Sequence, residues 1–183
     1  MAASSATIHF TAPLQRPAEP KGAAWLFVVL PGPASAKLPT RSMTTVDGTL
    51  GGQAFQVTLE PDGAGSHWFK IGHALARAAG AKAGDTVGFS VAPVAVEPEP
   101  KVPPDLRKAL AGHAAAKAQW ATLTAVARRD WIHWISSGKK AETRVKRIAT
   151  TCDKLACGQR RACCFDRSGM FSRGNIGAPK AAS

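Results

Sequence analysis

A proline-rich segment at residues 94–104 (VAVEPEPKVPP) separates two parts of the chain whose apolar residues follow different periods. Before it, short stretches alternate apolar and polar residues between glycines and prolines, a pattern typical of β-strands. After it, apolar residues recur every three or four positions, which is typical of amphipathic helices. Because proline fixes φ and favours an extended conformation in the preceding residue, the segment is expected to be a semi-rigid spacer. The sequence therefore predicts an α+β protein with domains at 7–95 and 105–171, a linker at 96–104 and a disordered tail at 172–183.

The first part is predicted to form a small closed β-barrel with one short helix. Strands are expected at 7–14, 25–30, 44–50, 53–60, 66–71 and 86–94, and the helix at 73–79. A Gly-Gly pair at 51–52 is a two-residue hairpin signal, since glycine supplies the positive φ that such a turn requires. This turn sets a register in which Val46 pairs with Val57, while Phe55 covers Gly48. Six short strands favour closure because a barrel leaves no exposed edge.

The second part is predicted to be an all-α domain of four helices. They are expected at about 105–112, 114–123, 125–137 and 140–156, with Thr124 as the cap of the third. The fourth helix carries an apolar stripe at Val145, Ile148, Cys152 and Leu155. Beside it lies a basic stripe at Lys140, Arg144, Arg147 and Lys154, continued by Arg160 and Arg161. One stripe is expected to face the core and the other to face solvent or a partner.

The basic excess of the chain lies entirely in its second part. Residues 1–100 contain 7 Lys+Arg and 7 Asp+Glu, whereas residues 101–183 contain 17 Lys+Arg and 5 Asp+Glu, which accounts for the net charge of +12. This asymmetry indicates contact with nucleic acid, an acidic protein or another anionic surface, although a solvated helical face explains it equally well. The first apolar run, residues 23–30, is too short to span a bilayer, and no secretory signal precedes it. A cytoplasmic protein is expected.

Two cation-rich stretches of the barrel, SAKLPTR and GAGSHWFK, supply a candidate ligand site. Its residues are Lys37, Arg41, Ser66, His67 and Lys70, which would converge at the mouth of the barrel. The loop at 62–66 would add backbone amides that face an anion. Ordinary loop chemistry is the alternative. No catalytic residue is predicted. The Gly-x-Gly precedes a strand and not a helix, so it is not a dinucleotide-binding fingerprint. Ser66 lacks the turn of a nucleophile elbow, so a hydrolase is not supported.

The cysteines and the tryptophans of the second part each have two interpretations. The cysteine spacing, C-x4-C-x5-C-C from Cys152, does not match the paired ligands of a structural zinc site, so no metal and no cofactor is predicted. Free thiols are expected, although the nearby Arg160, Arg161 and Arg167 would favour a reactive thiolate at Cys164. Trp131 and Trp134 follow two arginines, which suits stacking on single-stranded nucleic acid, but their helical spacing suits core packing.

Several segments resemble a known bacterial arrangement. The first part resembles a small barrel domain of unknown function (DUF) at SAKLPTR, EPDGAGSHW and AAGAKAGDTV. The second part resembles the YdeI family, also called OmpD-associated (OmdA) or bacteriocin-protection proteins, at RRDWIHWI, KKAETRVKRI and CCFDRSGMFS. The family name implies protection against bacteriocins or envelope stress, and the resemblance supplies no catalytic residues.

Two functions from different classes follow. The first is a non-catalytic binding protein of the stress-protection type, whose barrel takes a small anionic ligand and whose helical domain takes an acidic protein partner. The second is a nucleic-acid-associated protein that uses the basic helices, with an affinity that falls steeply as salt rises. An enzyme has the least support, because no acid/base pair or set of metal ligands is visible in the sequence.

Overall fold

The computed structural model describes residues 6–138, 140–162 and 177–182. By its internal contacts the chain divides into two compact units, and the division falls between Val96 and Glu97 in the proline-rich segment. The first unit also includes the C-terminal residues, whereas the second contains the helices that follow the segment.

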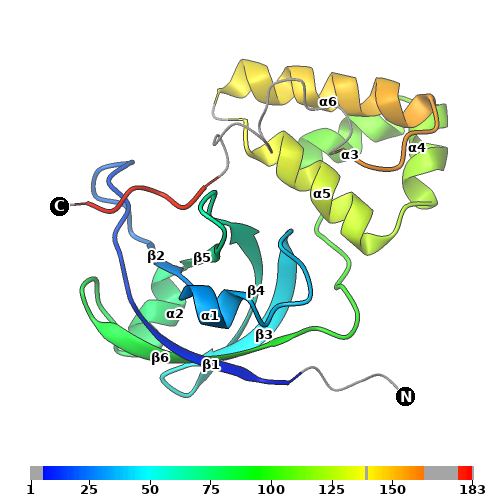
Figure 1. Ribbon diagram of the computed structural model, residues 1–183. Coiled ribbons are helices and arrows are strands. Elements are labelled where there is room, and N and C mark those ends of the chain that lie inside the picture. Colours follow the sequence, from blue (N-terminus) through cyan, green and yellow to red (C-terminus); the bar gives the residue numbers. More distant parts are fainter. Residues whose placement is uncertain (1–5, 139, 163–176, 183) are drawn as a thin grey trace. The chain divides into compact units, whose positions relative to one another are not determined.

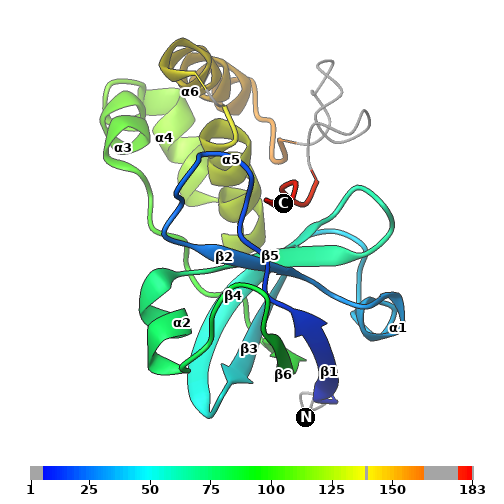
Figure 2. The same ribbon diagram turned by 90° about the vertical axis from the view of Figure 1, so that its left-hand side faces the viewer.

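The first unit is a nearly closed, six-stranded antiparallel barrel (Figures 1 and 2). Its strands are β1 (Ile8–Pro13), β2 (Leu26–Val29), β3 (Thr44–Leu50), β4 (Gln53–Pro61), β5 (His67–Ile71) and β6 (Thr86–Pro93), and they lie in the order β1-β6-β3-β4-β5-β2. The two outer strands meet just beyond β1, where Gln15 and Phe27 each donate their amide to the other's carbonyl at 2.9 and 2.8 Å. The predicted six-stranded barrel is confirmed in this nearly closed form.

The hairpin register predicted from the sequence is confirmed. Val46 lies opposite Val57, and Gly48 lies opposite Phe55. The approach at Gly48 is close, since a Cβ there would lie 2.7 Å from the end of the Phe55 ring. Phe55 in turn stacks on Phe69, with ring centroids 5.6 Å apart, so the aromatic that covers the glycine is tied to the barrel core.

Two short helices accompany the strands, where one was predicted. The predicted helix is α2 (His73–Ala78), whose C-terminal end lies against the turn between β3 and β4. The helix that was missed is α1 (Gly32–Ser35), a single turn. It has no apolar period to reveal it, but Pro33 suits a helix start because its fixed φ is already helical.

The C-terminal residues that the structure describes correct the expectation of disorder. Residues 177–182 lie along the barrel, with hydrogen bonds from Ala18 to the Lys180 carbonyl and from Ala182 to the Arg16 carbonyl, both at 2.8 Å. The amide of Ala178 donates to the Asp62 carbonyl at 3.2 Å. The rest of the predicted tail, 172–176 and 183, lies outside the described residues, as do Cys163 and Cys164.

The second unit contains the helices α3 (Pro104–Ala111), α4 (Ala114–Ala121), α5 (Ala125–Ser136) and α6 (Ala141–Ala156). Thr124 caps α5 as predicted, by accepting a hydrogen bond from the Ala127 amide. The side chains that form the core of this unit include Leu106, Leu110, Trp120, Trp131, Ile135, Ile148, Cys152 and Leu155. None of the helices in the described residues combines the length and apolar character needed to cross a bilayer.

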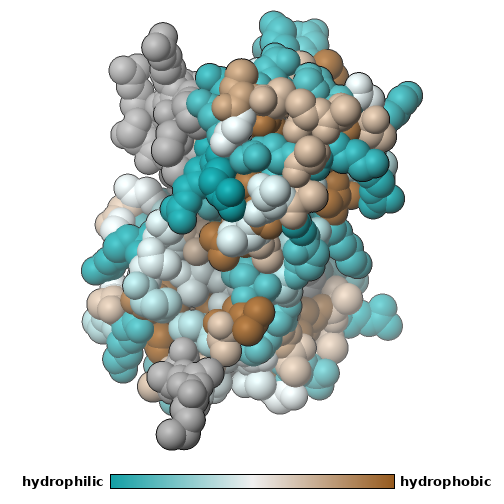
Figure 3. Space-filling view, turned by 90° about the vertical axis from the view of Figure 1, so that its right-hand side faces the viewer, coloured by the Kyte–Doolittle hydropathy of each residue, from teal (hydrophilic) through white to brown (hydrophobic). Residues whose placement is uncertain are grey.

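The predicted apolar stripe of α6 is wrong at one position. Val145 is 67% exposed, whereas Thr151 is fully buried beside Cys152 and Leu155. Helix geometry places Val145 at the edge of the face that Ile148, Cys152 and Leu155 share. The Thr151 hydroxyl donates to the Arg147 carbonyl at 2.8 Å, and this bond satisfies its polar group in the core. On the face drawn in Figure 3, the apolar surface is divided into small patches between polar atoms.

Candidate functional site

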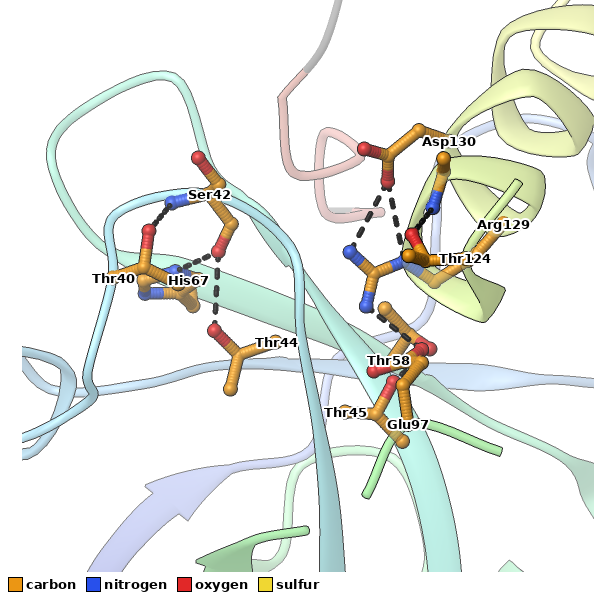
Figure 4. Close-up of polar contacts among 11 residues, drawn as sticks. Thr40, Ser42, Thr44, Thr45, Thr58, His67, Glu97, Thr124, Arg129 and Asp130 are labelled. Atoms are coloured by element: carbon orange, nitrogen blue, oxygen red, sulfur yellow. Dashed lines mark hydrogen bonds and ion pairs between the residues drawn. The ribbon is translucent and has the colours of Figure 1, made fainter. Parts of the chain in front are cut away.

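The predicted ligand residue His67 is a buried structural group. It begins β5, and its ring lies between the loop before β3 and helix α1 (Figure 4). Its Nε2 donates to the Ser42 carbonyl at 3.0 Å, since a carbonyl oxygen can only accept. In the neutral ring, Nδ1 then accepts from the Ser35 hydroxyl at 2.8 Å. Both ring nitrogens are therefore used inside the barrel.

Two more of the predicted residues, Arg41 and Ser66, hold the loop before β5 in place. The Arg41 guanidinium donates to the Gly65 carbonyl, and the Ser66 hydroxyl donates to the Leu30 carbonyl. The amides of Ala64 and Ser66 donate to the Asp62 carboxylate at 2.8 and 2.7 Å. Two of the amides that were expected to face an anion are thus directed to a side chain of their own loop.

The last two members, Lys37 and Lys70, are both exposed. Lys70 lies on β5 with its Nζ 4.6 Å from the centroid of the Trp25 ring. Because side chains alternate along a strand, Lys70 projects from the opposite face of β5 to the buried His67. The structure therefore brings Arg41 and Ser66, which lie in loops, near His67 at the start of β5, but turns Lys70 away from them. A shared ligand site for all five residues stays a prediction.

A different group of basic side chains surrounds a pocket of about 530 Å³ in the barrel unit. The titratable residues in its wall are Arg16, His73, Arg77 and Lys82, and apolar atoms of Leu26 and Ala76 line it as well. No acidic side chain occurs among the described residues that line it. We call this hollow the basic pocket. Its wall comes from four separate stretches of sequence, which is why sequence reasoning did not assemble it.

Local hydrogen bonds position the wall of the basic pocket. One N–H of the Arg16 guanidinium donates to the Ala23 carbonyl at 2.9 Å, and this bond positions the guanidinium at the edge of the pocket. Arg77 lies in the last turn of α2. The Lys82 amide donates to the Asp85 carboxylate at 2.8 Å, so the loop that carries Lys82 is closed by its own acid. That loop is joined to the end of β1 through hydrogen bonds between Leu14 and residues 84–85.

The predicted basic stripe of α6 is used largely within its own unit. Arg144 forms a two-pronged ion pair with Asp105, at 2.6 and 3.0 Å. Its hydrogen bonds lower the pKa of the Asp105 carboxyl below its ordinary value. Arg147 donates to the Trp134 carbonyl and to the Ser137 hydroxyl, and its guanidinium lies over the Trp134 ring.

The other members of the basic surface are more open. Lys140, Arg160 and Arg161 are exposed, and Arg160 donates to the Thr122 carbonyl at 3.0 Å. Lys154 is half-buried. A role for these residues in binding a partner stays a prediction.

The tryptophans of the helical unit and Cys152 are packing groups. Trp131 is buried in the core, and its ring meets that of Trp134 edge to face at 5.9 Å. Cys152 is also buried, and burial raises the pKa of its thiol, whereas Cys157 is exposed. No group of metal-ligating side chains is found within the described part of the chain.

Comparison with protein families accounts for both units. Residues 99–158 match the family described as bacteriocin-protection, YdeI or OmpD-associated (OmdA). Residues 10–91 match a domain of unknown function, DUF1905. The helical part of the chain is thus similar to the YdeI/OmpD-associated family, and the part before it is similar to the DUF1905 domain. The resemblance seen in the sequence is thereby confirmed: the DUF1905 match covers the barrel, and the OmdA match covers α3 to α6. No curated protein matches the sequence.

Proposed function

We propose that this protein is a non-catalytic, cytoplasmic binding protein of the bacteriocin-protection (OmdA) type, and that its DUF1905-like barrel binds a small anionic ligand. The observation that carries the proposal is the basic pocket. Arg16, Arg77 and Lys82 bring three cationic side chains to one hollow, together with His73.

The chemistry of the wall favours an anion with a small apolar body. Three cations with no acid in the wall give a positive potential, which attracts anions and raises their local concentration. Arginine is suited to carboxylate and phosphate groups because its fork of N–H donors matches their oxygens. Leu26 and Ala76 offer apolar contact to the rest of the ligand. The volume lies within the range of roughly 300–1,000 Å³ that is usual for small-molecule sites.

Binding of defined anions to the full chain tests the proposal. Calorimetric titration with inorganic phosphate, pyrophosphate and a short dicarboxylate compares the wild type with Arg77→Ala, an exposed helix position where the fold is expected to be kept. Loss of a charged hydrogen bond should weaken binding about tenfold or more. Lys37→Ala is the matched control, because it removes an exposed cation of the same unit that does not line the pocket.

The possible results separate the two barrel sites. Weaker binding in Arg77→Ala with Lys37→Ala unchanged supports the basic pocket. The reverse pattern would move the ligand to the barrel mouth that the sequence suggested. If none of the anions binds the wild type at millimolar concentration, the barrel is not an anion-binding module of this kind.

Nucleic acid binding by the helical domain is the second candidate, and the concentration of charge in residues 101–183 favours it. Because Arg144 and Arg147 are engaged within the unit, binding would rest on Lys140, Arg160 and Arg161. Titration with duplex and single-stranded DNA at rising salt tests it, and the logarithm of the affinity should fall linearly with that of the salt concentration. Equal affinity for the wild type and an Arg160→Ala/Arg161→Ala variant would contradict it.

A further inference from the structure

The proline-rich segment contacts the helical unit through ion pairs. Two of its acids pair with consecutive arginines of α5: Glu97 with Arg129 at 2.8 Å, and Glu99 with Arg128 at 2.6 Å. All four residues belong to the same compact unit. The alternation of glutamate and proline places both carboxylates on a short extended stretch, where they reach neighbouring side chains of one helix.

Arg128 is held in position by groups other than the segment. Its Nε donates to the Trp120 carbonyl at 3.2 Å, and one terminal nitrogen donates to the Ala121 carbonyl at 3.0 Å. These carbonyls lie in the last turn of α4, where the helix dipole favours a cation. The other terminal nitrogen donates to Glu99, which is the more exposed partner.

Arg129 lies between two carboxylates, as Figure 4 shows. It donates to Glu97 at 2.8 Å and to Asp130 at 3.1 Å. Only 13% of the side chain of either Arg129 or Glu97 is exposed, so this pair is shielded from solvent far more than the pair at Glu99. Burial raises the pKa of the Asp130 carboxyl above its ordinary value.

The far end of the segment is also attached. The Arg107 guanidinium donates to the Val102 carbonyl at 3.1 Å, and the Val102 side chain packs against the core of the helical unit. By contrast, Val96 is 81% exposed, directly before the first ion pair. The contacts therefore hold residues 97–102. On the other side, the Val94 amide donates to the Thr45 carbonyl at 3.0 Å, so residues 95–96 lie between the two attached stretches.

We infer that residues 97–102 act as a latch. By this we mean an acidic segment that binds Arg128 and Arg129 of its own helical unit reversibly. While the latch is closed, the joint of the chain is confined to residues 95–96. When it opens, the joint extends toward Val102, and Arg128 and Arg129 lose the two glutamates as partners. The latch goes beyond the proposed anion site and does not depend on it.

The two ion pairs should respond differently to salt. Exposed pairs are screened within a Debye length of about 3 Å at 1 M salt, whereas pairs shielded by protein are screened much less. Glu99 is 57% exposed and Glu97 is 13% exposed. High salt should therefore release the segment at Glu99 first, while Glu97 stays bound to Arg129.

Backbone order in the full chain tests the latch. ¹⁵N relaxation gives order parameters for the amides of Glu97, Glu99 and Lys101, which should be near the value of about 0.85 for rigid backbone in low salt. In a Glu97→Gln/Glu99→Gln variant they should fall below about 0.6. Glu142→Gln is the matched control, because it removes one exposed acid of the same unit. In 1 M NaCl the wild type should lose order at Glu99 and Lys101 before Glu97.

Each of the other results would overturn the latch. Order parameters already below about 0.6 in the low-salt wild type would mean that the ion pairs do not hold the segment. Unchanged order in the double variant would assign the rigidity to the prolines and Val102. Loss of order throughout α5 in the double variant would make the two acids part of the stability of the unit and not a latch.

Discussion

Substitution of Gly48 by alanine should destabilise the barrel, because there is no space for one methyl group. A Cβ at Gly48 would lie 2.7 Å from the Phe55 ring and 2.8 Å from the Ser90 carbonyl oxygen. The carbonyl is fixed by pairing between β3 and β6, and the ring is fixed by stacking on Phe69. Neither neighbour can yield without moving other groups of the core.

The expected loss follows from two opposing effects. Overpacking a well-filled site costs about 1–3 kcal/mol. Replacing glycine by alanine also reduces the entropy of the unfolded chain, which returns about 0.4–1 kcal/mol. The net free energy of unfolding should therefore fall by about 1–2 kcal/mol for Gly48→Ala.

Gly88→Ala is the matched control within the same barrel. Gly88 lies in β6, its φ is not positive, and nothing lies within 4 Å of a Cβ built there. The same substitution should stabilise by about 0.4–1 kcal/mol at this position. The free energies of unfolding of the two variants should therefore differ by about 1.4–3 kcal/mol.

Urea unfolding of the full chain, followed through the NMR signals of the barrel, measures both changes. Barrel signals are used because three of the five tryptophans, Trp120, Trp131 and Trp134, lie in the helical unit and would report on its unfolding. An unchanged dependence on urea would show that stability alone has altered. If Gly48→Ala proves as stable as Gly88→Ala, the close approach of Phe55 to Gly48 is not a feature of the folded protein.

Two carboxyl groups of the helical unit should respond to neutralisation in opposite directions. Because Arg144 lowers the folded pKa of Asp105 below its unfolded value of about 3.8, this group stabilises the unit above that pH and ceases to do so as pH falls through the folded pKa. Asp105→Asn should thus lose up to about 1 kcal/mol at pH 7, a small value because the pair is partly exposed, and this difference from the wild type should shrink as the pH is lowered toward 2. Burial raises the pKa of Asp130, so its charged form is disfavoured in the folded state and stability from this group rises as pH falls through that raised pKa. The free energy of unfolding of Asp130→Asn should therefore equal or exceed that of the wild type at pH 7. Chemical denaturation of both variants at both pH values measures these differences. A destabilised Asp130→Asn would show that the ion pair with Arg129 outweighs the cost of desolvation.

The barrel was predictable because its signals are local. Alternation of apolar residues reports strands directly, and the glycine pair at 51–52 fixes the turn and hence the register between Gly48 and Phe55. Helix α1 was not predictable in the same way, since a single turn is too short to show a period. The order of residues 177–182 depends on hydrogen bonds to residues about 160 positions earlier in the chain, such as Arg16 and Ala18, and no local pattern marks such partners.

The candidate sites depended on where side chains point, which sequence spacing leaves open. His67 and Lys70 are three residues apart, and the strand that carries them turns one inward and the other outward. Val145 matches the period of the α6 stripe but lies at its edge, so Thr151 is buried while Val145 is exposed. The basic pocket has no sequence signature, because Arg16 and Arg77 are brought together only by the closure of the barrel.

Counting charges along the sequence also gave no sign of a basic pocket in the barrel, because the count does not show which charges are paired. The first hundred residues are neutral by count, but two of their seven acids, Glu97 and Glu99, belong to the helical unit. Three of the others are engaged locally: Asp47 accepts from Gln56, Asp62 accepts from the amides of its own loop, and Asp85 accepts from the Lys82 amide. The cations of the basic pocket are therefore not matched by acids in its wall. In the basic helical unit the reverse holds, since its arginines are drawn into pairs with Glu97, Glu99 and Asp105. Residues 1–96 hold 7 Lys+Arg and 5 Asp+Glu, a much smaller excess than that of the helical unit. The potential that a ligand meets is set by which charges are paired at the site, and so the less basic barrel can carry the anion site while the strongly basic domain uses much of its charge in internal ion pairs.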